Sequence, residues 1–154
     1  MDAIETSSPF TIGVFQDVAW AQRGLEALIR AGLDPASLSI VAPDSAETRA
    51  LISRALGAVT IASLVLPEVG ASVAAGPLVA ALQGDSADLE KLGLSRTMRR
   101  VGFQAHDGRI YERLTARGGV LVAVHSEPRA ADALTLFLSY GGGNAAIGAW
   151  LGRL

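Results

Sequence analysis

The amino-acid sequence predicts an α+β domain: a small ferredoxin-like sheet built on a split β-α-β unit, with a helical, apolar insertion between its second and third strands. Short β-branched or aromatic runs are typical of the strands, and apolar residues at helical spacing mark the helices. The chain has 154 residues, of which 50% are hydrophobic, so it can bury a core without disulfides or metals. We expect residues 1–9 to be a flexible tail and residues 10–154 to form a single domain.

The first elements indicate a β-α-β unit. Residues 10–15 are β-branched and aromatic, which is typical of a strand. Asp17 can cap a helix over residues 18–31, where apolar positions follow one helical face, and Gly32 suits the left-handed position after that helix. Residues 38–42 predict the second strand. A right-handed crossover makes these two strands parallel, and in the split form a gap separates them.

Helical patterns follow over residues 44–117, which we expect to be the insertion. Asp44 and Glu47 are three residues apart, and this spacing predicts a capping box before a helix over residues 45–56. The insertion would then pack beside the sheet.

The last third of the chain predicts a broken helix, a central strand and a final helix. Ser95 can cap the helical segment 95–117, which we expect to break near residues 107–108 because glycine weakens a helix. Residues 118–125 are apolar on both faces, which is typical of a central strand. We expect this strand to fill the gap, antiparallel to both neighbours, with the helix 129–140 on the same face as the first helix. The alternative is a three-stranded sheet with helices on one side.

Residues 55–82 form a strongly apolar segment with one charged side chain, Glu68. We expect two short buried helices, 59–66 and 69–82, that turn at Pro67. The alternatives are reversible membrane association and a membrane span, and a central carboxylate opposes the span. A small sheet would cover one face of such a hairpin, so we expect a homo-oligomer, most simply a dimer. The expected interface residues are Leu66, Pro67, Val69, Gly70, Ala74, Ala75, Gly76 and Pro77.

Composition excludes several kinds of site and partner. The absence of cysteine removes disulfides, thiol catalysis and cysteine-ligated metals, and the net charge of −2 argues against nucleic acid as a partner. Residues 1–9 are acidic and polar, unlike a secretory signal, which predicts a cytoplasmic protein with the apolar segment as the one route to membrane association. Residues 145–151 fit either a short strand or a helical tail.

Candidate chemistry is sparse, and we expect no catalytic residue, cofactor or metal. His106, Asp107 and Glu112 offer imidazole and carboxylate groups, but their spacing is ordinary for a helix surface. His125 ends a strand, and Tyr111 and Glu112 precede that strand, so these three form a speculative ligand site with an acid–base pair.

Arginines gather in two groups before the last strand. The simplest expectation is a solvated face, and the alternative is an anionic partner such as lipid headgroups. These residues are Arg96, Arg99, Arg100, Arg109, Arg113 and Arg117.

Three stretches, taken in order, carry a resemblance to a known family. They are Gly13-Val14-Phe15 with Asp17 and Ala21, residues 66–78, and Tyr111-Glu112 leading to residues 118–124. Together they resemble the bacterial heat-induced, or general, stress protein domain of the YflT-like type, over roughly residues 10–140. The chain departs from the family pattern at Glu68, where the family has glycine, and at the polar residues 83–86.

The resemblance implies a stress-related role without a mechanism. Because no convergent set of polar residues accompanies the large apolar segment, we expect the protein to be non-enzymatic. It would act by self-association or by partner binding through the apolar helical hairpin. The alternative is a small-molecule-binding or enzymatic ferredoxin-like domain that uses His125, Tyr111 and Glu112.

Overall fold

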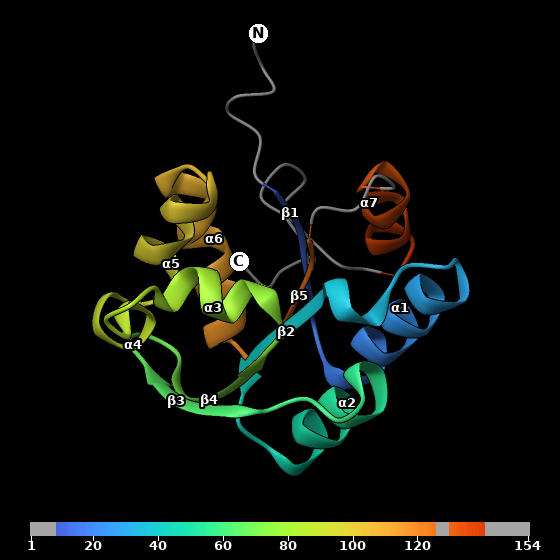
Figure 1. Ribbon diagram of the computed structural model, residues 1–154, viewed down its shortest axis with the longest axis horizontal. Coiled ribbons are helices and arrows are strands. Elements are labelled where there is room, and N and C mark those ends of the chain that lie inside the picture. The colour runs from blue at the N-terminus through green and yellow to red at the C-terminus, as the bar shows by residue number, and fades with distance from the viewer. Residues whose placement is uncertain (1–8, 126–129, 141–154) are drawn as a thin grey trace, which may run out of the picture.

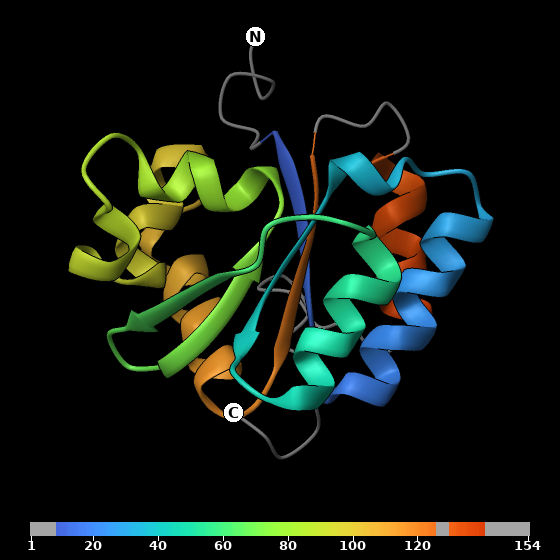
Figure 2. The ribbon, with the colours of Figure 1, turned by 60° about the horizontal axis from the view of Figure 1, so that its bottom comes forward.

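A five-stranded antiparallel sheet with helices on both faces forms the molecule (Figures 1 and 2). The structure is a computed structural model that describes residues 9–125 and 130–140. The strand order is β1-β5-β2-β4-β3, and every neighbouring pair is antiparallel. In chain order the elements are β1 (Phe10–Phe15), α1 (Val18–Arg30), η2 (Pro35–Ser37), β2 (Leu38–Pro43), α2 (Ala46–Leu56), β3 (Ala62–Leu66), β4 (Gly70–Ala75), α3 (Pro77–Gln83), α4 (Asp88–Leu92), α5 (Leu94–Thr97), η3 (Met98–Val101), α6 (Ala105–Ala116), β5 (Val120–His125) and α7 (Ala130–Ser139).

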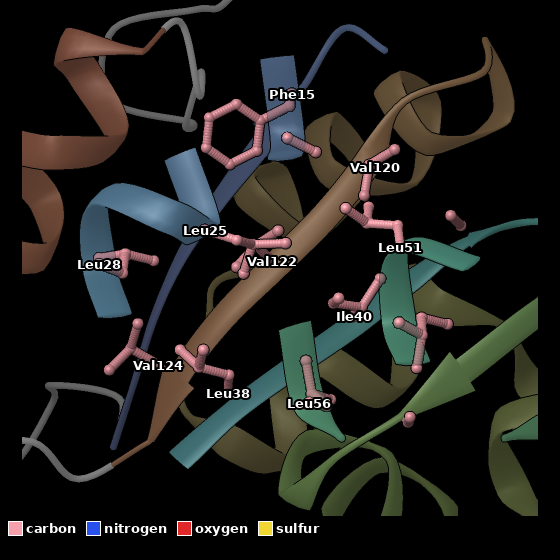
Figure 3. Close-up of a cluster of buried hydrophobic side chains, with 14 of the residues drawn as sticks. Phe15, Leu25, Leu28, Leu38, Ile40, Leu51, Leu56, Val120, Val122 and Val124 are labelled. Carbon is pink, nitrogen blue, oxygen red and sulfur yellow. The ribbon is translucent and has the colours of Figure 1, made fainter. Parts of the chain in front are cut away.

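Each face of the sheet has its own hydrophobic core. On one face α1, α2 and α7 cover the strands, and the side chains buried there include Phe15, Leu25, Leu51 and Val122 (Figure 3). On the other face α3 to α6 cover the strands. Central strands with both faces covered must be apolar on both faces, and this requirement explains the continuous apolar runs of β2 and β5.

The predicted β-α-β unit and its central strand are confirmed. β5 lies between β1 and β2 and is antiparallel to both. Asp17 caps α1 by accepting a hydrogen bond from the backbone N–H of Trp20 at 2.9 Å. Gly32 has a φ of 97°, as the position after α1 requires. The final helix α7 packs with α1 and β1 on the predicted face.

The sheet is larger than the sequence predicts. The β3–β4 hairpin extends it beside β2, so the observed order does not establish a four-stranded ferredoxin-like topology. The alternative of a three-stranded sheet covered on one side is wrong, because five strands are paired and both faces carry helices.

The predicted helix after the second strand is confirmed as α2, but its cap is shifted by one residue. Ser45 rather than Asp44 is the N-cap, and it accepts a hydrogen bond from the backbone N–H of Thr48 at 3.0 Å. The Thr48 hydroxyl in turn accepts from the Ser45 N–H, which completes a capping box. Asp44 instead forms an ion pair with Arg49 at 2.8 Å.

The two predicted helices in the apolar segment are wrong: residues 62–75 form a β-hairpin. In β3 the buried Leu64 and Leu66 alternate with the exposed Ser63 and Val65, which is the two-residue period of a strand with one covered face. The expected turn at Pro67 is correct, since Leu66 pairs with Gly70 across it. The insertion is therefore mixed rather than helical, and only its part at Pro77–Gln83 is helical within residues 59–83.

Three residues of the expected interface are buried within the chain. Leu66, Ala74 and Ala75 have exposed fractions of 2%, 0% and 2%. They belong to the cores of this chain, so they do not offer a surface to a second one. No helix within the described residues is long and apolar enough to cross a membrane.

The region before β5 breaks earlier than predicted. The helical path is interrupted between η3 and α6, at residues 102–104, and Gly108 lies inside α6. Gly108 is buried against α5, where a Cβ would lie 2.7 Å from the Ser95 backbone oxygen. Ser95 is inside α5, whose N-cap is Gly93. The predictions for the tail at residues 1–8 and for residues 145–151 fall outside the described residues.

Candidate functional site

A cleft of about 580 Å³ opens on the face of α3 to α6, beside the turn of the β3–β4 hairpin. A smaller hollow of about 300 Å³ adjoins it along α6. Both volumes fall in or near the range of small-molecule sites. Together the two are lined by Pro67, Glu68, Leu92, Ser95, Arg96, Arg99, Ala105, Arg109, Glu112, Arg113 and Ala116, and we call this region the arginine cleft.

Two short-range spacings bring four arginines to the cleft. Arg96 and Arg99 are three residues apart at the α5–η3 junction, and Arg109 and Arg113 are four apart on α6. Such spacings place each pair on one face of its helical segment. Because α5 packs on α6, the two faces meet at the same opening.

The guanidinium groups of these four arginines form no ion pair or hydrogen bond within the described part of the chain, 9–125 and 130–140. Other arginines there do so: Arg49 binds Asp44, and Arg100 binds Asp88. The cleft therefore presents guanidinium groups whose donors are directed to solvent or to a ligand. Each group holds a fork of N–H donors that matches carboxylate or phosphate oxygens.

Glu112 is a half-buried carboxylate in this basic setting. Its Oε2 accepts a hydrogen bond from the backbone N–H of Ser95 at 3.2 Å. Burial raises the pKa of Glu112 above its ordinary value of 4.5, hydrogen bonds from the Ser95 and Leu94 backbone oppose the rise, and the charge of Glu68 adds to it. Gly93, with a φ of 91°, makes room for the carboxylate, since a Cβ there would lie 3.2 Å from Oε2.

Glu68 stands in a strained position in the hairpin turn. Its φ is 70°, and within the described residues only Ala87 is another non-glycine residue with a positive φ. Proline followed by a residue with positive φ is the pattern of a type II turn, in which glycine is preferred at the second place. A side chain there costs about 1 kcal/mol. The turn therefore places a carboxylate at the rim of the cleft, and this conformation lowers the stability of the folded chain.

Of the three residues in the speculative ligand site, Glu112 alone lines the cleft. Tyr111 is buried in the core, where its ring makes an edge contact with Phe103 at 5.5 Å between centroids. His125 stacks on Phe10 at 4.4 Å at the end of β5.

The metal hypothesis also finds no support: His106 is exposed, and no group of three or more potential ligand side chains gathers in the part of the chain that the structure describes.

Sequence spacing indicates the two arginine groups but not that they line one region. The spacings of three and four residues were visible, whereas the contribution of Pro67, Leu92 and Ser95 to the same cleft depends on packing between separate segments.

The arrangement can hold an anion by charge and by guanidinium hydrogen bonds, with a backbone-anchored carboxylate beside it. In the comparisons with known proteins, no family model, no curated protein and no solved structure matches this chain.

Proposed function

We propose that this protein binds a small anionic ligand in the arginine cleft and acts as a binding protein. The observation that carries the proposal is the convergence of Arg96, Arg99, Arg109 and Arg113, all unpaired within the described residues, on one cleft of ligand size. This proposal belongs to the small-molecule-binding class that the sequence left as an alternative. Of the three residues in the speculative ligand site, only Glu112 belongs to the proposed site. Arginines, rather than Tyr111 and His125, supply the groups that bind the anion.

Charge repulsion supports this proposal over a purely structural role for the arginines. Three guanidinium groups line the larger hollow and a fourth lines the adjoining one; like charges repel, and the two carboxylates there offset only part of the positive charge. An anion between the two arginine pairs would relieve this repulsion and accept several charge-assisted hydrogen bonds.

The test is a calorimetric titration with inorganic phosphate and pyrophosphate at low ionic strength. Arg99→Ala and Arg109→Ala remove one guanidinium from each side of the cleft, and each should weaken binding about tenfold or more, since a hydrogen bond to a charged group contributes roughly 1.5–3 kcal/mol. Arg30→Ala is the matched control: it makes the same charge change at the end of α1, on the other face of the sheet, and should leave the affinity within about twofold.

Equal losses in Arg30→Ala and in the two cleft variants would contradict the proposal, because they would show a response to net charge alone. Absence of binding by both anions would contradict it as well. Vesicles of phosphatidylglycerol serve as a separate arm, since a lipid headgroup offers the same phosphate chemistry. Binding to vesicles without binding to free pyrophosphate would assign the cleft to a membrane surface instead.

The stress-related role, the cytoplasmic location and self-association remain separate proposals. The family resemblance supports the first, and the exposed edge strand β3 offers a surface for the last. We also propose that β1, α1, β2, β5 and α7 represent a ferredoxin-like half to which the β3–β4 hairpin has been added. The position of β5 between β1 and β2 supports this relation, and an experimental structure with β5 at a sheet edge would contradict it.

A further inference from the structure

The arginine cleft contains two carboxylates that an anion site does not need. Glu68 and Glu112 both line it, and each would repel a bound phosphate. Glu68 also occupies a backbone conformation that disfavours any side chain. The repulsion opposes simple anion binding, and the strained position of Glu68 does not help the fold, so the two carboxylates indicate a ligand with a second kind of group.

The orientation of Glu112 shows which kind of group fits. Its Oε2 accepts a hydrogen bond from the Ser95 N–H, and this bond holds the carboxylate at the wall of the cleft. A carboxylate has about four acceptor sites, so Glu112 keeps acceptor capacity beyond its backbone hydrogen bonds. Glu68 lines both hollows together with Glu112, so the cleft holds two carboxylate acceptors. A ligand in the cleft must therefore supply hydrogen-bond donors on that side.

The charge of the cleft decides between neutral and cationic donors. Four arginines and two glutamates leave a positive excess, so an ammonium group on the ligand would be repelled by the guanidinium groups. Hydroxyl groups donate hydrogen bonds without that penalty, and carboxylates are the usual acceptors for the hydroxyls of sugars in nucleotide sites. The cleft is lined by Pro67, Leu92 and Ala105 but by no aromatic ring, so it offers no stacking surface for a base.

We propose that the ligand of the arginine cleft is a phosphorylated sugar or polyol, with its phosphate on the arginines and its hydroxyls on Glu68 and Glu112. This inference rests on the proposed function, since it specifies the ligand of the same cleft. Glu68 and Glu112 are then specificity-determining residues, and they select the hydroxyl-bearing part of the ligand.

The experiment compares glucose 6-phosphate, ribose 5-phosphate and inorganic phosphate by calorimetric titration on the full chain. The readout is the ratio of affinities, sugar phosphate over phosphate. Wild type should give a ratio of at least tenfold. Glu112→Gln and Glu68→Gly should each lower that ratio by threefold or more, while Glu90→Gln, which removes the same charge from α4 outside the cleft, should leave it unchanged.

Glu68→Gly carries a second, independent readout. Glycine suits a φ of 70°, so this variant should raise the thermal unfolding midpoint while it lowers the affinity ratio. A rise in both would overturn the proposal, because Glu68 would then make no favourable contact with the sugar.

The outcomes separate this inference from the proposed function. If all three ligands bind equally and depend on Arg99 and Arg109, the hydroxyl selection is wrong and anion binding stands. If the carboxylate variants tighten every ligand by the same factor, the glutamates only repel, and the inference is again wrong. If no ligand binds through the arginines, both proposals fail.

Discussion

At the scale of single residues, the cleft combines groups whose charges act against one another. Glu112 accepts a hydrogen bond from the Ser95 backbone and lines the same cleft as the arginines, and burial raises its pKa. A group that loses part of its hydration and still keeps its charge lowers the stability of the folded chain. A charged residue that destabilises the fold is expected at a site where binding, rather than folding, determines which residue is present.

The pKa of Glu112 predicts a pH-dependent effect of Glu112→Gln. Between 4.5 and the raised folded value, the folded state binds more protons than the unfolded state, so the free energy of unfolding falls as pH rises through this window. Glutamine keeps an acceptor for the Ser95 N–H but carries no charge. The variant should therefore be more stable than wild type at pH 7, by less than about 1 kcal/mol because the site is partly solvated. The difference should vanish near pH 4.

Urea denaturation at both pH values measures this difference. A variant less stable than wild type at pH 7 would mean that the arginines stabilise the Glu112 carboxylate more than burial destabilises it. Glu90→Gln removes the same charge at an exposed site outside the cleft and is the control for the loss of one carboxylate.

At the scale of elements, the cleft depends on the close approach of α5 to α6. A glycine inside α6 permits that approach, since Gly108 lies against the Ser95 backbone with no room for a Cβ. One arginine pair lies on α5 and the adjoining η3 and the other on α6, so the separation of the pairs depends on the same contact. Gly108 weakens α6 locally, but it allows the close packing that positions the two arginine pairs.

Gly108→Ala tests this contact. In an exposed helix interior the change would stabilise by roughly 1 kcal/mol. Here a Cβ would lie 2.7 Å from the Ser95 oxygen, so we expect a loss of about 1–3 kcal/mol from overpacking. Phosphate affinity should fall as well, because α5 must move away from α6.

Urea denaturation and phosphate titration check both effects. His106→Ala, at an exposed position of the same helix, should stay within about 0.5 kcal/mol of wild type. A more stable Gly108→Ala variant with unchanged affinity would show that the helices relax without cost.

At the scale of the whole molecule, the sheet determines which apolar residues are available to a partner. The central strands are covered on both faces, whereas β3 is an edge strand with an unpaired side. Val65 on β3 is 69% exposed, the largest exposure among the large hydrophobic residues that the structure describes. A self-associating surface is therefore expected at this edge rather than along the buried residues of β4.

Two substitutions distinguish the edge from the core. Ala74→Glu places a carboxylate in a fully buried position of β4 and should prevent folding, since a buried unpaired charge costs several kcal/mol. Val65→Lys should leave the free energy of unfolding within about 0.5 kcal/mol. If the protein self-associates through β3, Val65→Lys alone should reduce the mass found by light scattering.

Circular dichroism monitors folding in the same samples. A folded Ala74→Glu variant would contradict the position of β4 between β2 and β3. An oligomer that persists in folded Val65→Lys would place the association surface elsewhere.

Much of the fold was determined by local sequence patterns. Asp17 and Gly32 delimit α1, and the doubly apolar run 120–125 gave both the strand and its central position. These predictions succeeded because caps, glycine positions and hydrophobic period act over a few residues, whatever the rest of the chain does.

What only the tertiary structure decided concerns residues 62–75 and the arginine cleft. Ala, Val, Leu and Gly at these positions carry too little polar contrast to mark a period, and pairing of β4 with β2 selects the strand conformation. The cleft joins residues from 67 to 116 that are distant along the chain. Sequence spacing placed each arginine pair on its own helical face, but the meeting of those faces depends on α5 packing against α6, which no local pattern encodes.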